Sequence, residues 1–399
     1  MTRKILIFST AYHPFIGGAE MAIKEITDRI DPDDIRFDMI TLRFDGNLPK
    51  FEKIGNVNVH RIGFTGKNPS IGDLVRFPLK INKLFFPFWA CLRAFRLHKK
   101  NRYDAVWAMM AAFAGFGAMF FKLRHPKTPY LLTLQEGDPI PEIKKKTRFV
   151  KPLFSKIFTK ADFIQAISTY LGKWARNMGF DGPLEIVPNG VDTKLFAGEY
   201  SKEELIESAK VVGKKEGDRF LVTTSRLVKK NAVDDVIRSL KYLPENVKFL
   251  VLGDGPDSEM LRKLAEEEGV AGRVIFRGAV GYAEIPKYLK IADVFVRPSL
   301  SEGMGNSFIE AMAAGLPVIA TQEGGIADFL FDSERNPDKE PTGWAVNPRD
   351  PKGIAETVKK ILDNPGQAAK TAANARKLAL EKYDWDLIAE KMKSIFERL

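Results

Sequence analysis

The sequence predicts an α/β protein made of two doubly wound, Rossmann-like domains that face each other across a cleft. Three observations lead to this prediction. Short apolar runs alternate with longer segments of helical period, this alternation restarts near the middle of the chain, and 399 residues are too many for one ordinary core. Hydrophobic residues make up 45% of the chain, so each half can bury a core of its own.

The first half contains five apolar runs that are typical of buried parallel strands. We expect these strands at residues 4–9, 37–42, 105–109, 129–133 and 163–167. Between the second and the third lies a basic segment with interleaved aromatic residues, 74–102. Two interpretations stay open for it: a basic amphipathic surface that faces a membrane, or a packed helix with a solvated basic face, which we prefer.

The second half repeats the pattern after the sequence PNGVD, 188–192. Its helices include residues 257–269, and the final segment, 383–399, also has apolar residues at helical spacing. The expected strands are 220–225, 247–253, 273–278, 293–299 and 317–321. In sheets of this kind ligands bind outside the carboxyl ends of the strands, so the loops that follow strands should carry the function.

Composition restricts the compartment and the partners. The single cysteine, Cys91, excludes an intrachain disulfide and favours a reducing compartment. The apolar run ILIF near the start is too short for a signal peptide, and no run approaches the ~20 residues of a membrane span, so we expect a cytoplasmic protein. The net charge of +11 favours anionic partners. A nucleic-acid-binding protein would need aromatic platforms or a recognition helix, and we find neither.

The loop after the first strand, YHPFIGGAEMAIKEI at 12–26, is a candidate anion or sugar-phosphate site. Gly17 and Gly18 let the backbone approach a ligand, and the helix that follows presents free N–H groups. His13 is a candidate for contact on the sugar or acceptor side. The alternative is a tight strand-to-helix turn without a ligand.

A basic cluster follows the strand at 220–225. Arg226, Lys229 and Lys230 stand between this strand and a helix that begins near Asn231. Cations at such a place suit a diphosphate, because arginine offers a planar fork and lysine a point charge. The alternative is an ordinary solvated charge run.

The stretch SEGMGNSFIEAMAAGLPVIAT, 301–321, carries two acids with seven residues between them. Glu302 should lie in the loop after a strand, and Glu310 about one turn into the next helix. The two positions lie on the order of 10–15 Å apart, comparable to a sugar, a diphosphate and a ribose in a row. A carboxylate can accept hydrogen bonds from two neighbouring hydroxyls, and a helix start suits a phosphate. The helix start is formed by Gly303, Gly305, Asn306 and Ser307.

These residues resemble the retaining glycosyltransferases of family four, which have the GT-B fold. The resemblance covers nearly the whole chain and includes YHPFIGGAE, VPNGVDTKLF, SRLVKKN and the stretch at 301–321. It implies an acceptor-binding domain, 1–184, and a nucleotide-sugar-binding domain, 185–382. It also implies that the last helix, 383–399, packs back on the first domain.

The resemblance also implies roles for individual residues. Glu310 would bind the ribose hydroxyls, and Glu302 would contact the donor sugar near the reacting centre. Arg226 and a nearby lysine would neutralise the diphosphate, while Gly17 and Gly18 would let their loop approach the donor phosphates.

Two positions depart from the family pattern. The family usually has its lysine five residues after the arginine, where this chain has Asn231, so we assign the role to Lys230, with Lys229 as a possible contributor. The family often has a histidine where this chain has Gln135, close to Asp138. Gln135 can hydrogen-bond a sugar hydroxyl but cannot act as a base.

We therefore expect a metal-independent retaining transferase that moves a hexose from a UDP- or GDP-sugar to a glycan or a lipid-linked acceptor. The Asp-x-Asp patterns at 31–34 and 384–386 fit turns and helix starts better than a metal site, and no cofactor is expected. The basic aromatic segments hint at peripheral contact with an anionic inner membrane face. The alternatives are an epimerase, a hydrolase or phosphorylase-like enzyme of the same fold, and a non-catalytic protein that binds sugar nucleotides.

Overall fold

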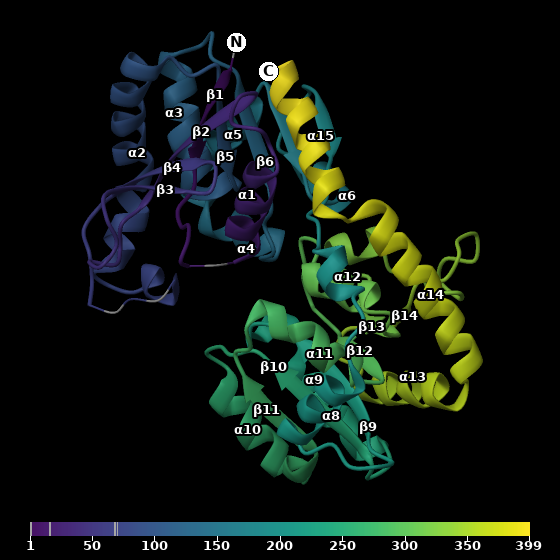
Figure 1. Cartoon of the computed structure of the whole chain (residues 1–399). Helices are drawn as coiled ribbons and strands as arrows, with labels where there is room; N and C mark the ends of the chain where they lie inside the picture. Colours follow the sequence, from purple (N-terminus) through teal and green to yellow (C-terminus); the bar gives the residue numbers. More distant parts are fainter. Residues whose placement is uncertain (1, 16, 68, 70) are drawn as a thin grey trace. The chain divides into compact units, whose positions relative to one another are not determined.

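The structure, a computed structural model, describes residues 2–15, 17–67, 69 and 71–399 (Figure 1). Its contacts divide the chain into two compact units: 1–189 with 385–399, and 190–384. The division falls after Asn189 rather than after 184, because residues 184–186 form a strand that pairs with the first sheet.

The first unit is built on an eight-stranded sheet in the order β3-β4-β2-β1-β5-β6-β7-β8. Only β3 runs antiparallel to its neighbour, β4. The strands are β1 Arg3–Phe8, β2 Ile35–Leu42, β3 Phe51–Ile54, β4 Val57–Ile62, β5 Ala105–Met109, β6 Tyr130–Leu134, β7 Phe163–Ala166 and β8 Leu184–Ile186.

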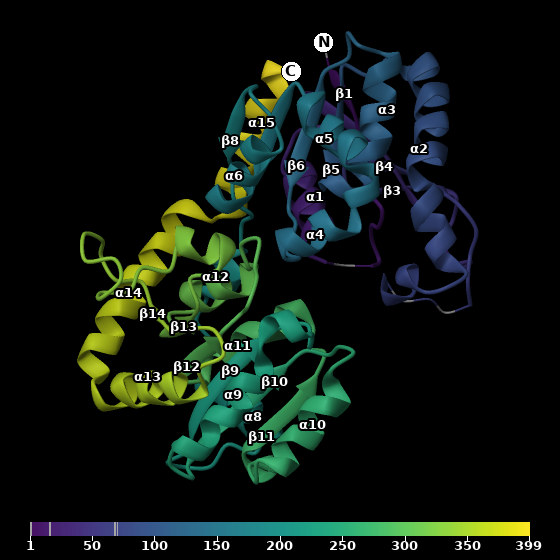
Figure 2. The same cartoon turned by 180° about the vertical axis from the view of Figure 1, so that it is seen from behind.

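Helices cover both faces of this sheet. Figures 1 and 2 show α2 and α3 on the side opposite to α1 and α15. The apolar side of α15 enters the same core as α1 and the strands, through Trp385, Met392 and Phe396. The helices are α1 Gly18–Asp28, α2 Leu79–Asn101, α3 Phe116–Arg124, α4 Ile140–Lys146, α5 Lys151–Thr159, α6 Thr169–Asn177 and α15 Trp385–Arg398, with short turns η1 Ile71–Val75, η2 Ala111–Gly115 and η3 Arg148–Val150.

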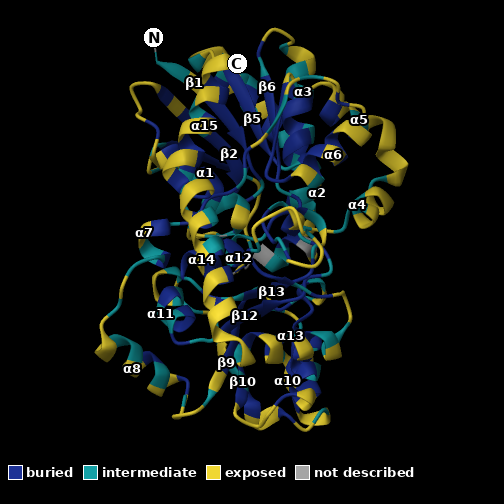
Figure 3. Cartoon of the chain, turned by 90° about the vertical axis from the view of Figure 1, so that its right-hand side faces the viewer, coloured by how far each residue is buried: buried dark blue, intermediate teal, exposed yellow. Residues whose placement is uncertain are grey.

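The second unit is built on a parallel six-stranded sheet in the order β11-β10-β9-β12-β13-β14. Its strands are β9 Arg219–Thr224, β10 Val247–Leu252, β11 Val274–Gly278, β12 Val294–Arg297, β13 Val318–Ala320 and β14 Trp344–Ala345. Its helices are α7 Thr193–Phe196, α8 Lys202–Val211, α9 Val233–Ser239, α10 Ser258–Glu267, α11 Ile285–Lys290, α12 Asn306–Ala313, α13 Pro351–Asp363 and α14 Pro365–Lys382, with turns η4 Lys229–Asn231, η5 Leu240–Tyr242, η6 Ala271–Arg273, η7 Tyr282–Glu284 and η8 Gly324–Asp328. The central strands of both sheets are buried, and the outer faces of the helices are exposed (Figure 3).

Each sheet has a point at which the strand order reverses. In the first sheet it lies between β1 and β5, and in the second between β9 and β12. Doubly wound sheets bind their ligands beside the strand ends at this point. The chemistry of each unit should therefore lie in the loops that follow these four strands.

The predicted fold class is confirmed, and all ten predicted strands are present within two residues at each end. The strands β3, β4, β8 and β14 were missed. The side chains of β3 are exposed or half-buried, and β8 and β14 have three and two residues, so none of these three gives a clear apolar run. The alternation of β4 includes the polar residues Asn58, His60 and Arg61.

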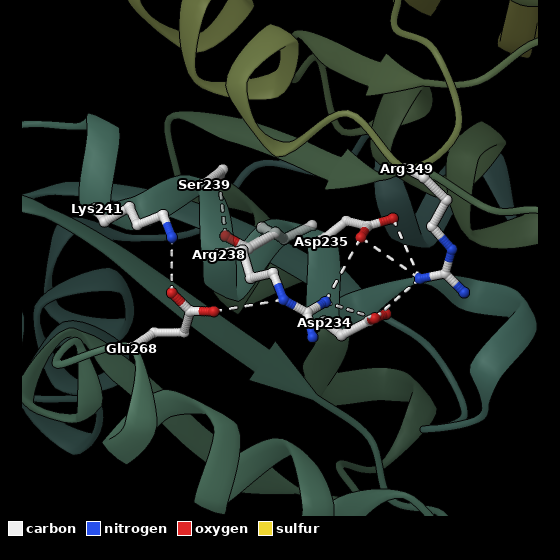
Figure 4. A network of polar contacts seen from close by, with 8 residues as sticks. Asp234, Asp235, Arg238, Ser239, Lys241, Glu268 and Arg349 are labelled. Atoms are coloured by element: carbon white, nitrogen blue, oxygen red, sulfur yellow. Dashed lines mark hydrogen bonds and ion pairs between the residues drawn. The ribbon is translucent and has the colours of Figure 1, made fainter.

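A charged network fixes α9 within the second unit (Figure 4). Arg349, which precedes α13, donates to Asp234 at 2.8 Å and approaches the buried Asp235 at 3.4 Å. Arg238 pairs with Asp234 at 2.8 Å and approaches Glu268, at the end of α10, at 3.4 Å. Burial raises the pKa of Asp235, and the neighbouring Asp234 adds to this, whereas the two arginines oppose it.

We expect Arg349→Gln to lower the thermal midpoint of unfolding by about 2–4 °C, because it removes a cation beside a buried carboxylate. The folded-state pKa of Asp235 is raised, so its charge destabilises the folded state fully only at a pH above that pKa. Scanning calorimetry should therefore show a larger drop in the thermal midpoint of the Arg349→Gln variant at pH 7 than at pH 4. Arg277→Gln is the control, since this exposed arginine has no ion pair among the described residues. Equal midpoints for both variants at pH 7 would contradict the role of the network.

Candidate functional site

Two loops of the second unit meet at the point where the strand order of its sheet reverses. β9 and β12 are hydrogen-bonded neighbours, so the segments that follow them leave the same edge of the sheet. The backbone N–H of Leu300 donates to the carbonyl of Lys230 at 2.7 Å and ties the two loops together. The predicted basic cluster after β9 and the predicted acidic stretch after β12 are therefore adjacent.

Glu302 lies in the loop after β12 and is largely buried. Its Oε2 accepts a hydrogen bond from Arg297 Nη2 at 3.0 Å, and its Oε1 lies 3.5 Å from Lys230 Nζ. The loop itself is held by Gly325, whose N–H donates to the Glu302 carbonyl at 3.0 Å. The carboxylate thus stands between two cations that come from adjacent strands.

Glu310 lies one turn into α12, as predicted, and it is buried. Burial raises its pKa to about 7, and the Arg297 guanidinium and a hydrogen bond from the Tyr282 hydroxyl oppose that rise. Tyr282 comes from the turn after β11, and its ring packs edge-on against Phe196 at 5.4 Å. A carboxyl group with this pKa can change its charge near neutral pH.

The start of α12 depends on a glycine. Gly305 precedes the helix with φ of +91°, a conformation that favours glycine. A β-carbon there would lie 2.6 Å from the Phe308 ring and 2.7 Å from Arg297 Nη2. Gly303, Asn306 and Ser307 also lie at this helix start, and the Ser307 hydroxyl accepts from Arg297 Nη1 at 2.6 Å.

The basic cluster after β9 has one inward and two outward cations. Lys230 faces Glu302, whereas Arg226 and Lys229 are exposed. The described part of the chain offers the Arg226 guanidinium no hydrogen bond or ion pair. Asn231, which stands where the family has a lysine, is buried and donates to the Arg226 carbonyl at 2.7 Å. It therefore fixes the loop and leaves the cationic role to its neighbours.

Buried polar atoms without a hydrogen-bond partner gather at the same place. Among the described residues, six of the ten side chains with such atoms lie on β9, on β12 or in the loops after them. They are Thr223, Thr224, Ser225, Asn231, Arg297 and Ser299. Buried polar groups are nearly always paired, so this concentration is typical of a functional site.

In the first unit, the predicted loop after β1 leads directly into α1. Gly17 is the N-cap of α1 and Gly18 its first residue, while Ile16 lies outside the described residues. A β-carbon on Gly17 would lie 2.7 Å from Glu20 Oε2. The His13 ring is half-buried, its Nε2 has no partner among the described residues, and burial lowers its pKa.

The acceptor-side candidates after β6 have different surroundings. Gln135 and Asn189 exchange two amide hydrogen bonds, at 2.9 and 3.3 Å. Gln135 thus anchors the last residue of the first unit. Asp138 is exposed, just before α4.

The sequence did not point to Glu136, which is buried between Gln135 and the turn after β5. Its Oε1 accepts from the N–H of Ala111 at 2.6 Å and its Oε2 from that of Gln135 at 3.0 Å. Burial raises its pKa to about 7. The turn that it holds has two residues with positive φ, Met110 at 75° and Phe113 at 56°. Such strain persists only where surrounding contacts impose it.

Arg297 and Tyr282 were also missed. Arg297 is a charged residue within the apolar run DVFVRPS. A single charge does not prevent such a run from being predicted as a strand, so this charge was not taken as a separate signal. Tyr282 lies in the turn after β11, for which no site residue was predicted. The charge of Arg297 inside a parallel strand was the one sequence feature that could have identified it.

The aspartates of the two Asp-x-Asp patterns have partners. Asp31 accepts from the N–H of Asp33, and Asp34 pairs with Lys393. Asp384 accepts from the Thr193 hydroxyl, and Asp386 from Arg29 at 2.7 Å. No helix within the described ranges is both long and apolar enough to cross a membrane.

Two family models together match most of the chain: Glycosyltransferase Family 4 over residues 16–195, and Glycosyl transferases group 1 over residues 205–378. An uncharacterized glycosyltransferase of Methanocaldococcus jannaschii is 26% identical, with 99% of this chain and 98% of that protein aligned. A GDP-mannose-dependent alpha-(1-6)-phosphatidylinositol monomannoside mannosyltransferase of Mycolicibacterium smegmatis is 31% identical over 58% of this chain and 60% of its own length.

Solved structures share the fold over the whole chain. Sucrose-phosphate synthase from Thermosynechococcus elongatus superposes with a TM-score of 0.81 at 21% identity, covering 99% of this chain and 98% of that one. The Anabaena protein HepE, solved in complex with UDP and glucose, gives 0.76 at 19% identity with both chains fully covered.

The contact between Gly324 and the Glu302 loop gives a testable prediction. Gly324 has φ of +65°, and a β-carbon there would lie 2.1 Å from the Glu302 carbonyl oxygen. We expect Gly324→Ala to lower the thermal midpoint by several degrees, because strain of about 1–2 kcal/mol adds to a backbone clash. The control is Gly272→Ala, where nothing lies within 4 Å of the new carbon. A Gly324→Ala protein as stable as this control would show that the loop is not held as described.

Proposed function

Because the chain belongs to the glycosyl transferases of group 1 and is a GT-B transferase that uses a nucleotide-sugar donor, we propose that it moves a hexose from a UDP- or GDP-sugar to an acceptor hydroxyl. The acceptor is a glycan or a lipid-linked glycan. The anomeric configuration is retained, and no divalent metal is required. The mycobacterial and corynebacterial mannosyltransferases among the relatives, which act on phosphatidylinositol monomannosides, favour a lipid-linked acceptor.

One observation carries this proposal: Glu302 and Glu310 lie on either side of a helix start, Arg297 and Lys230 pair with Glu302, and the charge of Arg297 also acts on Glu310. Glu310 is suited to accept from the two ribose hydroxyls, and Glu302 to accept from the donor sugar. Asn306 and Ser307 are the first two residues of α12, and the backbone N–H groups of a first helical turn favour a phosphate. This order of groups supports a donor whose sugar, diphosphate and ribose lie in one row.

The bond that breaks joins the sugar to the diphosphate, and negative charge develops on the leaving diphosphate. Arg226 and Lys230, with the start of α12, stabilise this charge. Arg226 is exposed and has no ion pair among the described residues, so its charge is available to a phosphate. In the first unit, Gly17 and Gly18 let the loop before α1 approach the donor phosphates.

Retention is proposed as a substitution in which the acceptor hydroxyl attacks from the face that the diphosphate leaves. A double displacement would need a carboxylate free to attack the sugar carbon. Glu302 is held by Arg297 and lies near Lys230, which suits it to bind hydroxyls rather than to act as a nucleophile.

The second candidate function is an epimerase or hydrolase of the same fold. The Gln135 amide is paired with Asn189 and supplies no base, and an epimerase or a hydrolase would also need a base, so this position does not favour that function. Assays of sugar transfer against hydrolysis and epimerisation of UDP- and GDP-sugars separate these functions. A protein that binds the sugar nucleotide without turnover would be a non-catalytic module.

The first unit also has a surface that suits a membrane. One packed helix, α2, exposes residues at four-residue intervals: Lys80, Leu84, Phe88, Leu92 and Arg96. The three central side chains are 51–57% exposed, so the solvated face is apolar in its middle and basic at its ends. The helix packs one face, as the preferred interpretation has it, and its solvated face carries an apolar stripe between basic ends. We propose that this face docks on anionic lipid.

The donor site is tested with a thermal-shift panel of UDP-, GDP- and ADP-sugars, followed by transfer assays with the sugar nucleotide that stabilises the protein. We expect Glu310→Ala to abolish this stabilisation and to reduce transfer by at least 100-fold, about the loss of a charge-assisted hydrogen bond pair. Wild-type transfer should persist in excess EDTA. Full loss of activity in EDTA, together with an unaffected Glu310→Ala variant, would overturn the assignment.

The membrane surface is tested by sedimentation with phosphatidylcholine vesicles that contain phosphatidylglycerol. We expect wild-type protein to bind, and the Leu84→Asp, Phe88→Asp double variant to lose at least 80% of binding, because charged side chains do not enter the acyl region. The matched control is Ile206→Asp, Val211→Asp on α8, which alters apolar residues of similar exposure in the second unit. Equal losses in both double variants, or wild-type protein that binds no vesicle, would contradict the proposal.

A further inference from the structure

Arg297 carries its charge at a buried position, which is unfavourable for a guanidinium. It is the last residue of β12, which lies between β9 and β13, and only 5% of it is exposed. Taking a guanidinium out of water costs several kcal/mol unless its partners compensate. Burial accordingly lowers its pKa, while Glu302 and then Glu310 oppose this.

The contacts of Arg297 join three segments of the second unit. Nη2 donates to Glu302 at 3.0 Å, and Nη1 donates to the Ser307 hydroxyl at 2.6 Å and approaches the Thr224 carbonyl at 3.4 Å. The guanidinium also stacks over the Phe308 ring, 4.1 Å from its centre. One side chain thus reaches β9, the Glu302 loop and the start of α12.

These contacts do not amount to a simple stabilising ion pair. Arg297 Nε is buried and has no hydrogen-bond partner among the described residues. A buried ion pair is often no more stable than apolar residues of equal volume, and an unpaired buried donor destabilises the folded state further. Stability therefore does not explain the buried guanidinium of Arg297. Its effect on the carboxylates of Glu302 and Glu310 does.

We propose that Arg297 is a positioning residue of the donor site, which orients Glu302 through its planar fork and keeps Glu310 ionised through its charge. The inference rests on the proposed function and deepens it. Lysine could supply the charge but not the fork. The two effects can therefore be separated by substitution.

The surroundings of Glu310 limit what else could set its charge. Tyr282, from the turn η7, donates to the carboxyl group, and α7 brings the apolar Phe196 against that tyrosine. Arg376 of α14 lies near Gly315, at the far end of α12. Glu302 pairs with Arg297 from the loop after β12, and Lys230 faces Glu302 from the loop after β9. Arg297 is thus the cation whose removal should act most on Glu310.

The experiment measures binding of UDP and GDP, and of their glucose and mannose derivatives, by isothermal titration calorimetry from pH 6 to pH 9. The free Glu310 carboxyl has a pKa of about 7, and only its ionised form accepts two hydroxyls, so wild-type affinity should rise about tenfold between pH 6 and pH 8. In Arg297→Met, this rise should move to higher pH, and a displacement of one pH unit should lower affinity at pH 7 about fivefold.

Arg297→Lys separates position from charge. We expect its affinity for the nucleotide alone, and the pH profile, to stay within about twofold of wild type, whereas affinity for the nucleotide sugar falls about tenfold because Glu302 is no longer oriented. Arg277→Met is the matched surface control, and circular dichroism verifies folding. Unchanged nucleotide-sugar binding in Arg297→Lys would overturn the positioning role, even if Arg297→Met does not fold. If wild-type protein binds none of the nucleotides, the proposed function fails, and this inference fails with it.

Discussion

The proposed donor site depends on one constraint: Glu302 and Glu310 must stay charged and in place within a largely buried part of the second unit. The charge of Glu302 is stabilised by two cations, Arg297 at 3.0 Å and Lys230 at 3.5 Å. The charge of Glu310 is stabilised less, since burial raises the pKa of this carboxyl group to about 7. The parallel sheet makes the arrangement possible, because β9 and β12 are neighbours and deliver the cations and the acids to the same edge.

Much of this could be predicted from the sequence, because each signal was local. Apolar runs identify buried strands, and the spacing of Glu302 and Glu310 places one in a loop and the other in a helix. Which strands are neighbours is not a local property of the sequence, and the strand order shows that β9 and β12, which precede Lys230 and Glu302, lie side by side. Arg297 was missed because a single charge in an apolar run does not change its period, and the pairing of Gln135 with Asn189 joins residues 54 positions apart.

The first unit also has a point at which its strand order reverses, between the central strands β1 and β5. The turn after β5 contains residues with strained backbone angles, and the buried carboxylate of Glu136 holds this turn through a hydrogen bond. Strain and buried charge lower stability, and both are found near the strand ends where doubly wound sheets bind ligands. Away from those ends, α2 combines a packed face with an exposed apolar stripe. The unit thus has one feature suited to a small ligand and another suited to a lipid surface.

The most direct test of the central claim is a crystal structure of the protein with an intact nucleotide sugar bound. The account predicts ribose hydroxyls on the Glu310 carboxylate, the diphosphate at Arg226, Lys230 and the start of α12, and the hexose hydroxyls on Glu302. A sugar nucleotide bound elsewhere, with Glu302 and Glu310 making no contact to it, would contradict the account.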